Sequence, residues 1–234
     1  TESHALLQAG LQALDESVPI LSEESPAQDL VGRRSWNRFW LVDPLDGTKE
    51  FLGGTGEFTI NIALIEAHRP LLGVLYVPLE ETAFIGIPGL GAHRYCLRRS
   101  GEWECISLAA RPLAPGQKLT VLASRRHRNA HLDACLAWLR EHWGPLERLD
   151  SGSALKFCQL AAGEGDFYPR FSPCCEWDTA AGQALLEAAG GALLGMDGQP
   201  LRYNCRDTLM SPHFYGFADA GHPLWSKLLD NQPF

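Results

Sequence analysis

A short apolar run that ends in Asp43-Pro44 is the feature that most constrains how this chain can fold. Residues 39–42 are continuously apolar, which favours a buried strand over a helix. Because proline cannot extend a sheet ladder, the strand is predicted to end there and the chain to turn. Asp43 and Asp46 stand three residues apart across that turn, and Gly47 permits a tight backbone. The motif therefore predicts two carboxylates aimed at one point.

Oxygen ligands grouped in this way suit Mg²⁺ or a similar hard cation. The candidates in the turn are Asp43, Asp46 and the Leu45 carbonyl, and Thr48 stands where it can cap a following helix. An ordinary Asp-Pro turn with a capping aspartate is the alternative, and for this motif alone it is the simpler interpretation.

Two further acidic positions, Glu23-Glu24 and Asp178, are candidates for the same site. Each has a plainer interpretation, because the two glutamates can be solvated loop charges and Asp178 can stabilise a helix N-terminus. If all converge, the carboxylates must take up protons or bind cations. Two Mg²⁺ ions bridged by a carboxylate are the usual arrangement for phosphoester hydrolysis.

Composition excludes several classes of protein. The 234 residues carry a formal net charge of −8, which disfavours a surface for binding nucleic-acid polymers. With 45% hydrophobic and 21% charged residues, the composition is that of a soluble globular chain. No apolar run reaches transmembrane length, and no signal peptide is visible. Seven cysteines without CxxC spacing indicate a reduced, cytoplasmic protein, and the oligomeric state is left open.

Periodicity divides the chain into two halves near residues 111–117, where prolines and a glycine cluster. The first half, residues 1–115, is predicted to be α+β and contains the SEE and DPLDGT motifs. Its predicted elements are a helix over 3–17 (with Leu7, Leu11, Leu14 and Val18 on one face), a loop over 26–37, a hairpin of strands 58–64 and 71–77, and a strand over 82–86.

The second half, residues 116–234, alternates strands with helices and contains the GSALK and WDTAAG motifs. This alternation predicts α/β units with some parallel strand pairing. The predicted elements are strands over 119–123 and 146–149, and helices over 130–141, 153–162 and 179–189.

The segment WLVDPLDGTKEF, preceded by SEE and followed by WDTAAG, resembles the inositol-monophosphatase-like superfamily of metal-dependent phosphatases. Residues 49–51, 56–64, 152–158 and 168–171 are most similar to its bacterial 3′(2′),5′-bisphosphate nucleotidases. The resemblance implies a layered αβαβα sandwich of mixed α+β and α/β character. It also implies Mg²⁺-dependent hydrolysis of 3′-phosphoadenosine 5′-phosphate, a by-product of sulfate assimilation, to AMP and phosphate, with inhibition by Li⁺.

The resemblance further implies a role for each motif residue, with two or three Mg²⁺ ions per site. Glu23, Asp43 and the Leu45 carbonyl correspond to ligands of one ion, and Asp43, Asp46 and Asp178 to ligands of a second. The catalytic residues correspond to Glu23, Thr48 and Asp46, of which Glu23 and Thr48 would orient the attacking water. The residues expected to contact the small-molecule nucleotide substrate are Gly47, Thr48, Lys49, Ser151, Gly152, Ser153, Lys156, Arg170 and Asp178.

Three alternatives remain open from the sequence. The chain can be an inositol- or sugar-phosphate phosphatase with the same metal site, or a catalytically dead homologue that binds nucleotide or metal. The catalytically dead homologue is disfavoured by the intact set Glu23, Asp43, Asp46, Thr48 and Asp178. A peripheral position at the inner face of the cell membrane is the alternative to a free cytoplasmic one. Finally, members of the superfamily carry a further N-terminal helix and an aspartate that would fall just before Thr1, so we expect this chain to lack that segment.

Overall fold

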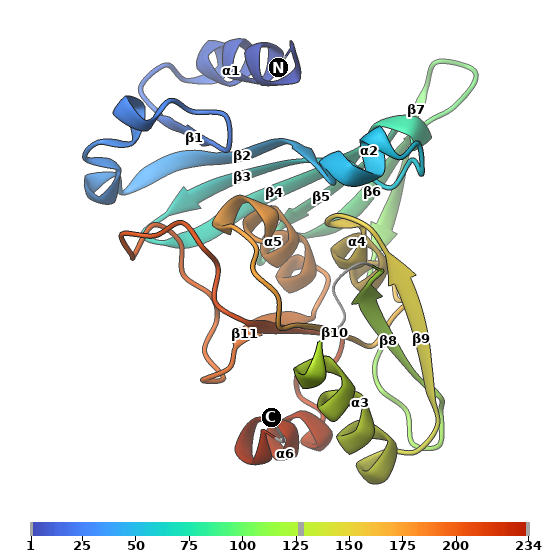
Figure 1. Ribbon diagram of the computed structural model, residues 1–234. Helices are drawn as coiled ribbons and strands as arrows, with labels where there is room; N and C mark the ends of the chain where they lie inside the picture. The colour runs from blue at the N-terminus through green and yellow to red at the C-terminus, as the bar shows by residue number, and fades with distance from the viewer. Residues whose placement is uncertain (1, 126–128, 233–234) are drawn as a thin grey trace.

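Helices and two β-sheets alternate in layers in the computed structural model, which describes residues 2–125 and 129–232 (Figure 1). Helix α1 (Glu2–Leu14) lies on the outer face of a seven-stranded sheet, and α4 (Leu155–Ala161) and α5 (Ala180–Ala188) lie between the two sheets. Helices α3 (Ala130–His142) and α6 (Pro223–Asn231) cover the far face of a five-stranded sheet. The expected αβαβα sandwich is thereby confirmed.

The seven-stranded sheet follows the order of the sequence. Strand β1 pairs with β2 in parallel, and all later neighbours are antiparallel, as the predicted hairpin β3–β4 requires. Strands β6 and β7, of which β7 is the edge strand, were not predicted, because their residues do not alternate clearly between apolar and polar. The strands are β1 (Ile20–Ser22), β2 (Arg38–Asp46), β3 (Thr59–Glu66), β4 (Arg69–Val77), β5 (Thr82–Ile87), β6 (Gly91–Leu97) and β7 (Trp103–Leu108).

The predicted end of the strand at Asp43-Pro44 is wrong. Strand β2 continues to Asp46, with Asp43 paired to Asn61, Asp46 paired to Thr59 and an irregularity between the two pairs. A bulge of this kind absorbs a proline, which has no N–H to offer, without ending the ladder. The bulge also redirects the side chains on either side of it.

The five-stranded sheet has the order β11-β12-β10-β8-β9. Strand β8 pairs in parallel with both β9 and β10, which confirms the predicted parallel pairing in this half. Its strands are β8 (Leu119–Ser124), β9 (Leu146–Ser151), β10 (Phe167–Arg170), β11 (Ala192–Gly195) and β12 (Phe214–Phe217). The division into domains 1–115 and 116–234 stays a prediction. The two halves share one hydrophobic core cluster, which contains Leu41 from the first half and Leu122 from the second.

Helix α5 packs directly on the backbone of the seven-stranded sheet. Gly73 on β4 and Gly86 on β5 are cross-strand partners. A Cβ atom built on Gly73 would lie 2.2 Å from the Ala181 carbonyl oxygen, and one on Gly86 would lie 2.3 Å from the Leu185 Cα atom. Glycine is therefore needed at both positions. The contact of these two glycines with α5 fixes the helix that follows Asp178 relative to the sheet that carries Asp43.

Helix α1 is shorter than predicted. It ends at Leu14, which is 74% exposed, so the prediction that Leu14 packs inward is wrong. The side chain of Asp15 accepts hydrogen bonds from the backbone and hydroxyl of Ser17, and such local bonds compete with a continuing helix. Leu11 and Val18 are buried as expected. No helix in the described part of the chain combines the length and apolar character needed to cross a membrane.

Candidate metal and phosphate site

Two aspartates of the DPLDGT motif and one from far along the chain meet beside the bulge in β2. Asp43 and Asp46 flank that bulge, and Asp178 ends the short 3-10 turn η4 (Glu176–Asp178) just before α5. Each offers one carboxylate oxygen, and these oxygens all lie within 4.8 Å of one another. The structure thus brings together acidic residues from the DPLDGT and WDTAAG motifs.

Backbone and side-chain donors orient each carboxylate of this aspartate cluster (Asp43, Asp46 and Asp178). Asp43 accepts a hydrogen bond of 2.9 Å from the Leu45 N–H, which lies inside the bulge. Asp46 accepts one of 3.3 Å from the Asn61 side chain on β3, and Asp178 accepts one of 2.8 Å from the Cys175 N–H. The carboxylates are therefore held in place before any ligand arrives.

The charges of the cluster oppose one another. Burial raises the pKa of Asp43, and the neighbouring charges of Asp46, Glu23 and Asp178 raise it further. The pKa of Asp178 is also raised, first by burial and then by Asp46. Carboxylates placed this closely must hold protons or share a cation. Because all the donors are hard oxygens, the cluster fits a divalent cation such as Mg²⁺.

Glu23 lies beside the aspartate cluster but is not a member of it. It follows β1, its N–H donates to the Val42 carbonyl at 3.1 Å, and its side chain is exposed. Its charge nevertheless acts on the pKa values of Asp43 and Asp178, which requires a nearby position.

Thr48 and Leu45 are connected across the turn. The Thr48 hydroxyl donates to the Leu45 carbonyl at 3.3 Å, so it does not cap the helix as the sequence suggested. The N-cap of α2 (Thr48–Leu52) is Gly47, which has a φ of 91° and makes no side-chain cap bond. Glycine suits this left-handed conformation, and a Cβ there would approach the Glu57 carbonyl oxygen to 3.1 Å.

The start of α1 contacts the SEE and the DPLDGT motifs. The sequence analysis did not predict these contacts. The Ser3 hydroxyl donates to the Pro44 carbonyl at 2.8 Å, and His4 Nδ1 lies 3.0 Å from the Ser22 hydroxyl, next to Glu23. Single polar residues on an exposed helix give no signal in the sequence that could have revealed these contacts.

A pocket of about 260 Å³ opens beside the aspartate cluster. Its walls come from both halves of the chain, and residues Glu50, Ser124, Arg125, Tyr168 and Thr179 line it without having been predicted. Glu23, Asp43, Leu45 and Ser151 do not appear among the described residues that line it. The predicted residues that do are Asp46, Gly47, Thr48, Lys49, Gly152, Ser153, Lys156, Arg170 and Asp178.

Lys156 is buried beneath this pocket, with an exposed fraction of 1%. Its ammonium group donates to the carbonyl oxygens of Ser151, Gly152 and Ser153 at 3.0, 3.2 and 2.6 Å. An ammonium has three N–H donors, so all of them are occupied by this loop. Ser151 also directs its hydroxyl to Gln159, at 3.0 Å.

The remaining cations of the pocket have donors left for a ligand. Arg170 uses its guanidinium to contact the carbonyls of Ser172 and Pro173 at 3.2 and 3.1 Å, and a guanidinium carries five N–H groups. Lys49 is exposed. Arg125 pairs with Glu57 at 2.5 Å, and the same carboxylate accepts a 2.7 Å hydrogen bond from the Gly152 N–H.

A model of the inositol monophosphatase family matches residues 1–225. The chain belongs to this family. It is 41% identical over 212 residues to the 3′(2′),5′-bisphosphate nucleotidase CysQ of Escherichia coli K12, an alignment that covers 91% of this chain and 80% of that protein. It is 31% identical over 218 residues to the CysQ nucleotidase of Aggregatibacter actinomycetemcomitans, covering 93% of this chain and 78% of that one.

Solved structures of the family have the same fold. CysQ from Bacteroides thetaiotaomicron superposes with a TM-score of 0.74 at 38% identity, covering 86% of this chain and 76% of that one. An inositol monophosphatase from Zymomonas mobilis gives a TM-score of 0.74 at 21% identity, covering 99% and 81%. The latter is a likeness of fold alone. The resemblance seen in the sequence is confirmed.

Proposed function

We propose that this family member is a Mg²⁺-dependent 3′(2′),5′-bisphosphate nucleotidase that hydrolyses 3′-phosphoadenosine 5′-phosphate to AMP and phosphate. The observation that carries the proposal is the aspartate cluster at the wall of a pocket that also contains Lys49, Arg125 and Arg170. The cluster suits cleavage of one phosphate, and the cations suit neutralisation of a second. The identity to CysQ nucleotidases supports the choice of substrate.

The aspartate cluster would hold the metal ions. Asp43, Asp46 and Asp178 would bind one Mg²⁺, and Asp43 with Glu23 and the Leu45 carbonyl would bind another. Bound Mg²⁺ supplies Lewis-acid stabilisation of the charge on the attacking and leaving oxygens.

The chain's own residues would orient water and phosphate. Glu23, whose carboxylate is exposed next to the cluster, would accept a proton from the attacking water, and the hydroxyl oxygen of Thr48 would orient this water by accepting a hydrogen bond from it. Backbone N–H groups of Gly47 and Thr48 face the phosphate at the start of α2. The water oxygen would form the new bond to phosphorus as the bond from phosphorus to the ester oxygen breaks, and this ester oxygen would take up a proton from solvent to become the 3′-hydroxyl of AMP.

The second phosphate would meet the cationic part of the pocket. Lys49, Arg125 and Arg170 have N–H donors available, whereas Lys156 holds the loop of residues 151–153 that forms one wall. The Ser153 hydroxyl of that loop is buried without a hydrogen-bond partner, which supports a role for it as a donor to the substrate. We further propose a cytoplasmic location, in keeping with a substrate that arises in sulfate assimilation.

Phosphate release from purified protein tests the proposal. With Mg²⁺ the bisphosphate should be hydrolysed faster than inositol 1-phosphate, and EDTA should abolish both reactions. Faster hydrolysis of inositol 1-phosphate would identify an inositol phosphatase instead. No Mg²⁺-dependent release from either compound would contradict the proposal, provided that the protein is folded by circular dichroism.

A further inference from the structure

The position of Asp178 depends on the turn of residues 175–178. Its carboxylate accepts the Cys175 N–H at 2.8 Å, so it moves with this backbone. The same segment is paired to the chain at residues 209–211 by two backbone bonds of 2.8 Å, from Glu176 N–H to the Leu209 carbonyl and from Ser211 N–H to the Cys174 carbonyl. Whatever fixes this turn fixes the distance from Asp178 to the other aspartates.

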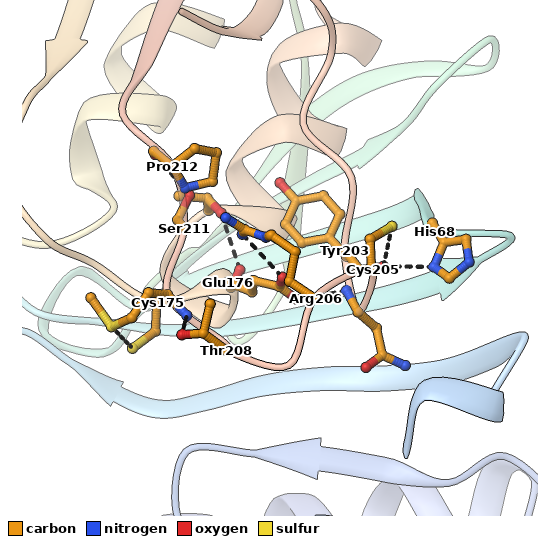
Figure 2. Close-up of polar contacts among 12 residues, drawn as sticks. His68, Cys175, Glu176, Tyr203, Cys205, Arg206, Thr208, Ser211 and Pro212 are labelled. Atoms are coloured by element: carbon orange, nitrogen blue, oxygen red, sulfur yellow. Dashed lines mark hydrogen bonds and ion pairs between the residues drawn. The ribbon is translucent and has the colours of Figure 1, made fainter. Parts of the chain in front are cut away.

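Glu176 anchors the turn from its buried side (Figure 2). It is 1% exposed and is not part of the aspartate cluster. One carboxylate oxygen accepts the Asn204 N–H at 2.7 Å, and the other accepts a guanidinium N–H of Arg206 at 3.3 Å. Figure 2 shows the Arg206 side chain reaching Glu176, with Cys175 next in the chain. Every oxygen of this buried carboxylate therefore has a donor.

Asn204 links Glu176 to Arg33 by hydrogen bonds. Asn204 is fully buried, and its φ of 58° lies in the left-handed region. Its side-chain N–H donates to the Arg33 carbonyl at 2.6 Å, and its side-chain oxygen accepts a guanidinium N–H from Arg33. A second N–H of Arg33, which is only 6% exposed, donates to the Arg206 carbonyl at 2.9 Å.

Arg33 belongs to the connection between the two other metal motifs. It starts the 3-10 turn η2 (Arg33–Ser35), which lies between β1, followed by Glu23, and β2, which carries Asp43. The chain Glu176–Asn204–Arg33, called here the polar bridge, thus joins the turn of Asp178 to the segment that connects Glu23 and Asp43.

We propose that Glu176 is a positioning residue for the metal site, acting with Asn204 and Arg33 to hold Asp178 at the distance that cation binding requires. This inference rests on the proposed function, since it assigns support of the same metal site. Fully paired buried polar groups admit one arrangement of their neighbours, and a half-satisfied network does not. Replacing the partners that orient metal ligands typically weakens metal affinity about 10–100-fold.

Mn²⁺ binding measured by calorimetry, without substrate, tests the polar bridge. E176A should weaken Mn²⁺ binding about tenfold, and E176Q, which keeps an acceptor for the Asn204 N–H but loses the bond from Arg206, should recover part of that loss. D166A is the matched control, because Asp166 is also 1% exposed and also pairs with an arginine, Arg111, at 2.6 Å. That variant should lower the melting temperature while leaving Mn²⁺ affinity unchanged.

Equal Mn²⁺ affinity in E176A and wild type, with a lower melting temperature, would show that Glu176 only stabilises the fold. If E176A does not fold, N204G decides the matter, because glycine suits the positive φ and keeps the N–H that meets Glu176. N204G loses both bonds to Arg33, so it should weaken Mn²⁺ binding, and unchanged affinity would overturn the proposal. A wild-type protein that binds Mn²⁺ but does not hydrolyse the bisphosphate would refute the proposed function alone. A wild-type protein that binds no divalent cation would overturn both.

Discussion

Replacing Lys156 by methionine separates two roles for this residue, support of the pocket wall and contact with phosphate. Methionine keeps most of the apolar stem and removes the ammonium. Three carbonyls of residues 151–153 then lose their donor, at about 1–3 kcal/mol each. Removing the ammonium also removes the free-energy cost of burying its charge, which offsets part of this loss. The pKa of Lys156 falls from 10.5 to about 8, mainly through burial, which corresponds to about 3 kcal/mol.

The net expectation is a loss of about 3 kcal/mol in the free energy of unfolding. For a chain of this size, that lowers the melting temperature by about 6–12 °C. The difference should depend on pH. Because the pKa of Lys156 is lower in the folded protein, the unfolded chain holds more protons between pH 8 and 10.5. The stability of the wild type gains from this group as pH rises through that window, so its advantage over K156M should widen.

Thermal unfolding and kcat/KM on two substrates are the measurements. K156M should lose activity equally on the bisphosphate and on a simple monophosphate, because the whole wall of the pocket is disturbed. K49M is the control: Lys49 is exposed, so its loss should leave the melting temperature unchanged. It should reduce use of the bisphosphate selectively, by the about 1.5–3 kcal/mol of one charge-assisted contact. A K156M protein with the wild-type melting temperature and a selective loss on the bisphosphate would refute the reasoning.

Three other predictions concern the metal site and the core. D46N, which keeps the shape of the side chain, should lower turnover at least about 100-fold with an unchanged circular dichroism spectrum; near-normal turnover would refute the metal assignment. LiCl should inhibit Mg²⁺-dependent turnover where the same concentration of KCl does not, and equal responses would count against a site of this family's type. G73A and G86A should each destabilise the fold by about 1–3 kcal/mol in thermal unfolding, because α5 occupies the space of the new methyl group. G10A, where nothing lies within 4 Å, is the control, and equal melting temperatures in all three variants would contradict the packing argument.

The sequence alone determined the features that neighbouring residues create. Alternating and periodic apolar residues predicted the hairpin β3–β4 and the helices α3 and α5, because these patterns report which side of an element is buried. The metal motif was also recognisable, since Asp43, Leu45 and Asp46 are close in sequence. Local patterns failed in β6 and β7, whose residues do not alternate clearly between apolar and polar, and at Pro44, where a bulge let the strand continue.

Tertiary structure alone decided which distant residues meet. Asp178 reaches Asp43 and Asp46 because α5 lies on Gly73 and Gly86, and neither glycine signals this contact in the sequence. Lys156 looked like a phosphate-binding cation, yet its three donors are used by the loop beside it. Hydrogen bonds and close packing act over a few ångströms of space rather than along the chain. Their partners therefore become known only when the two sheets and the helices between them are in place.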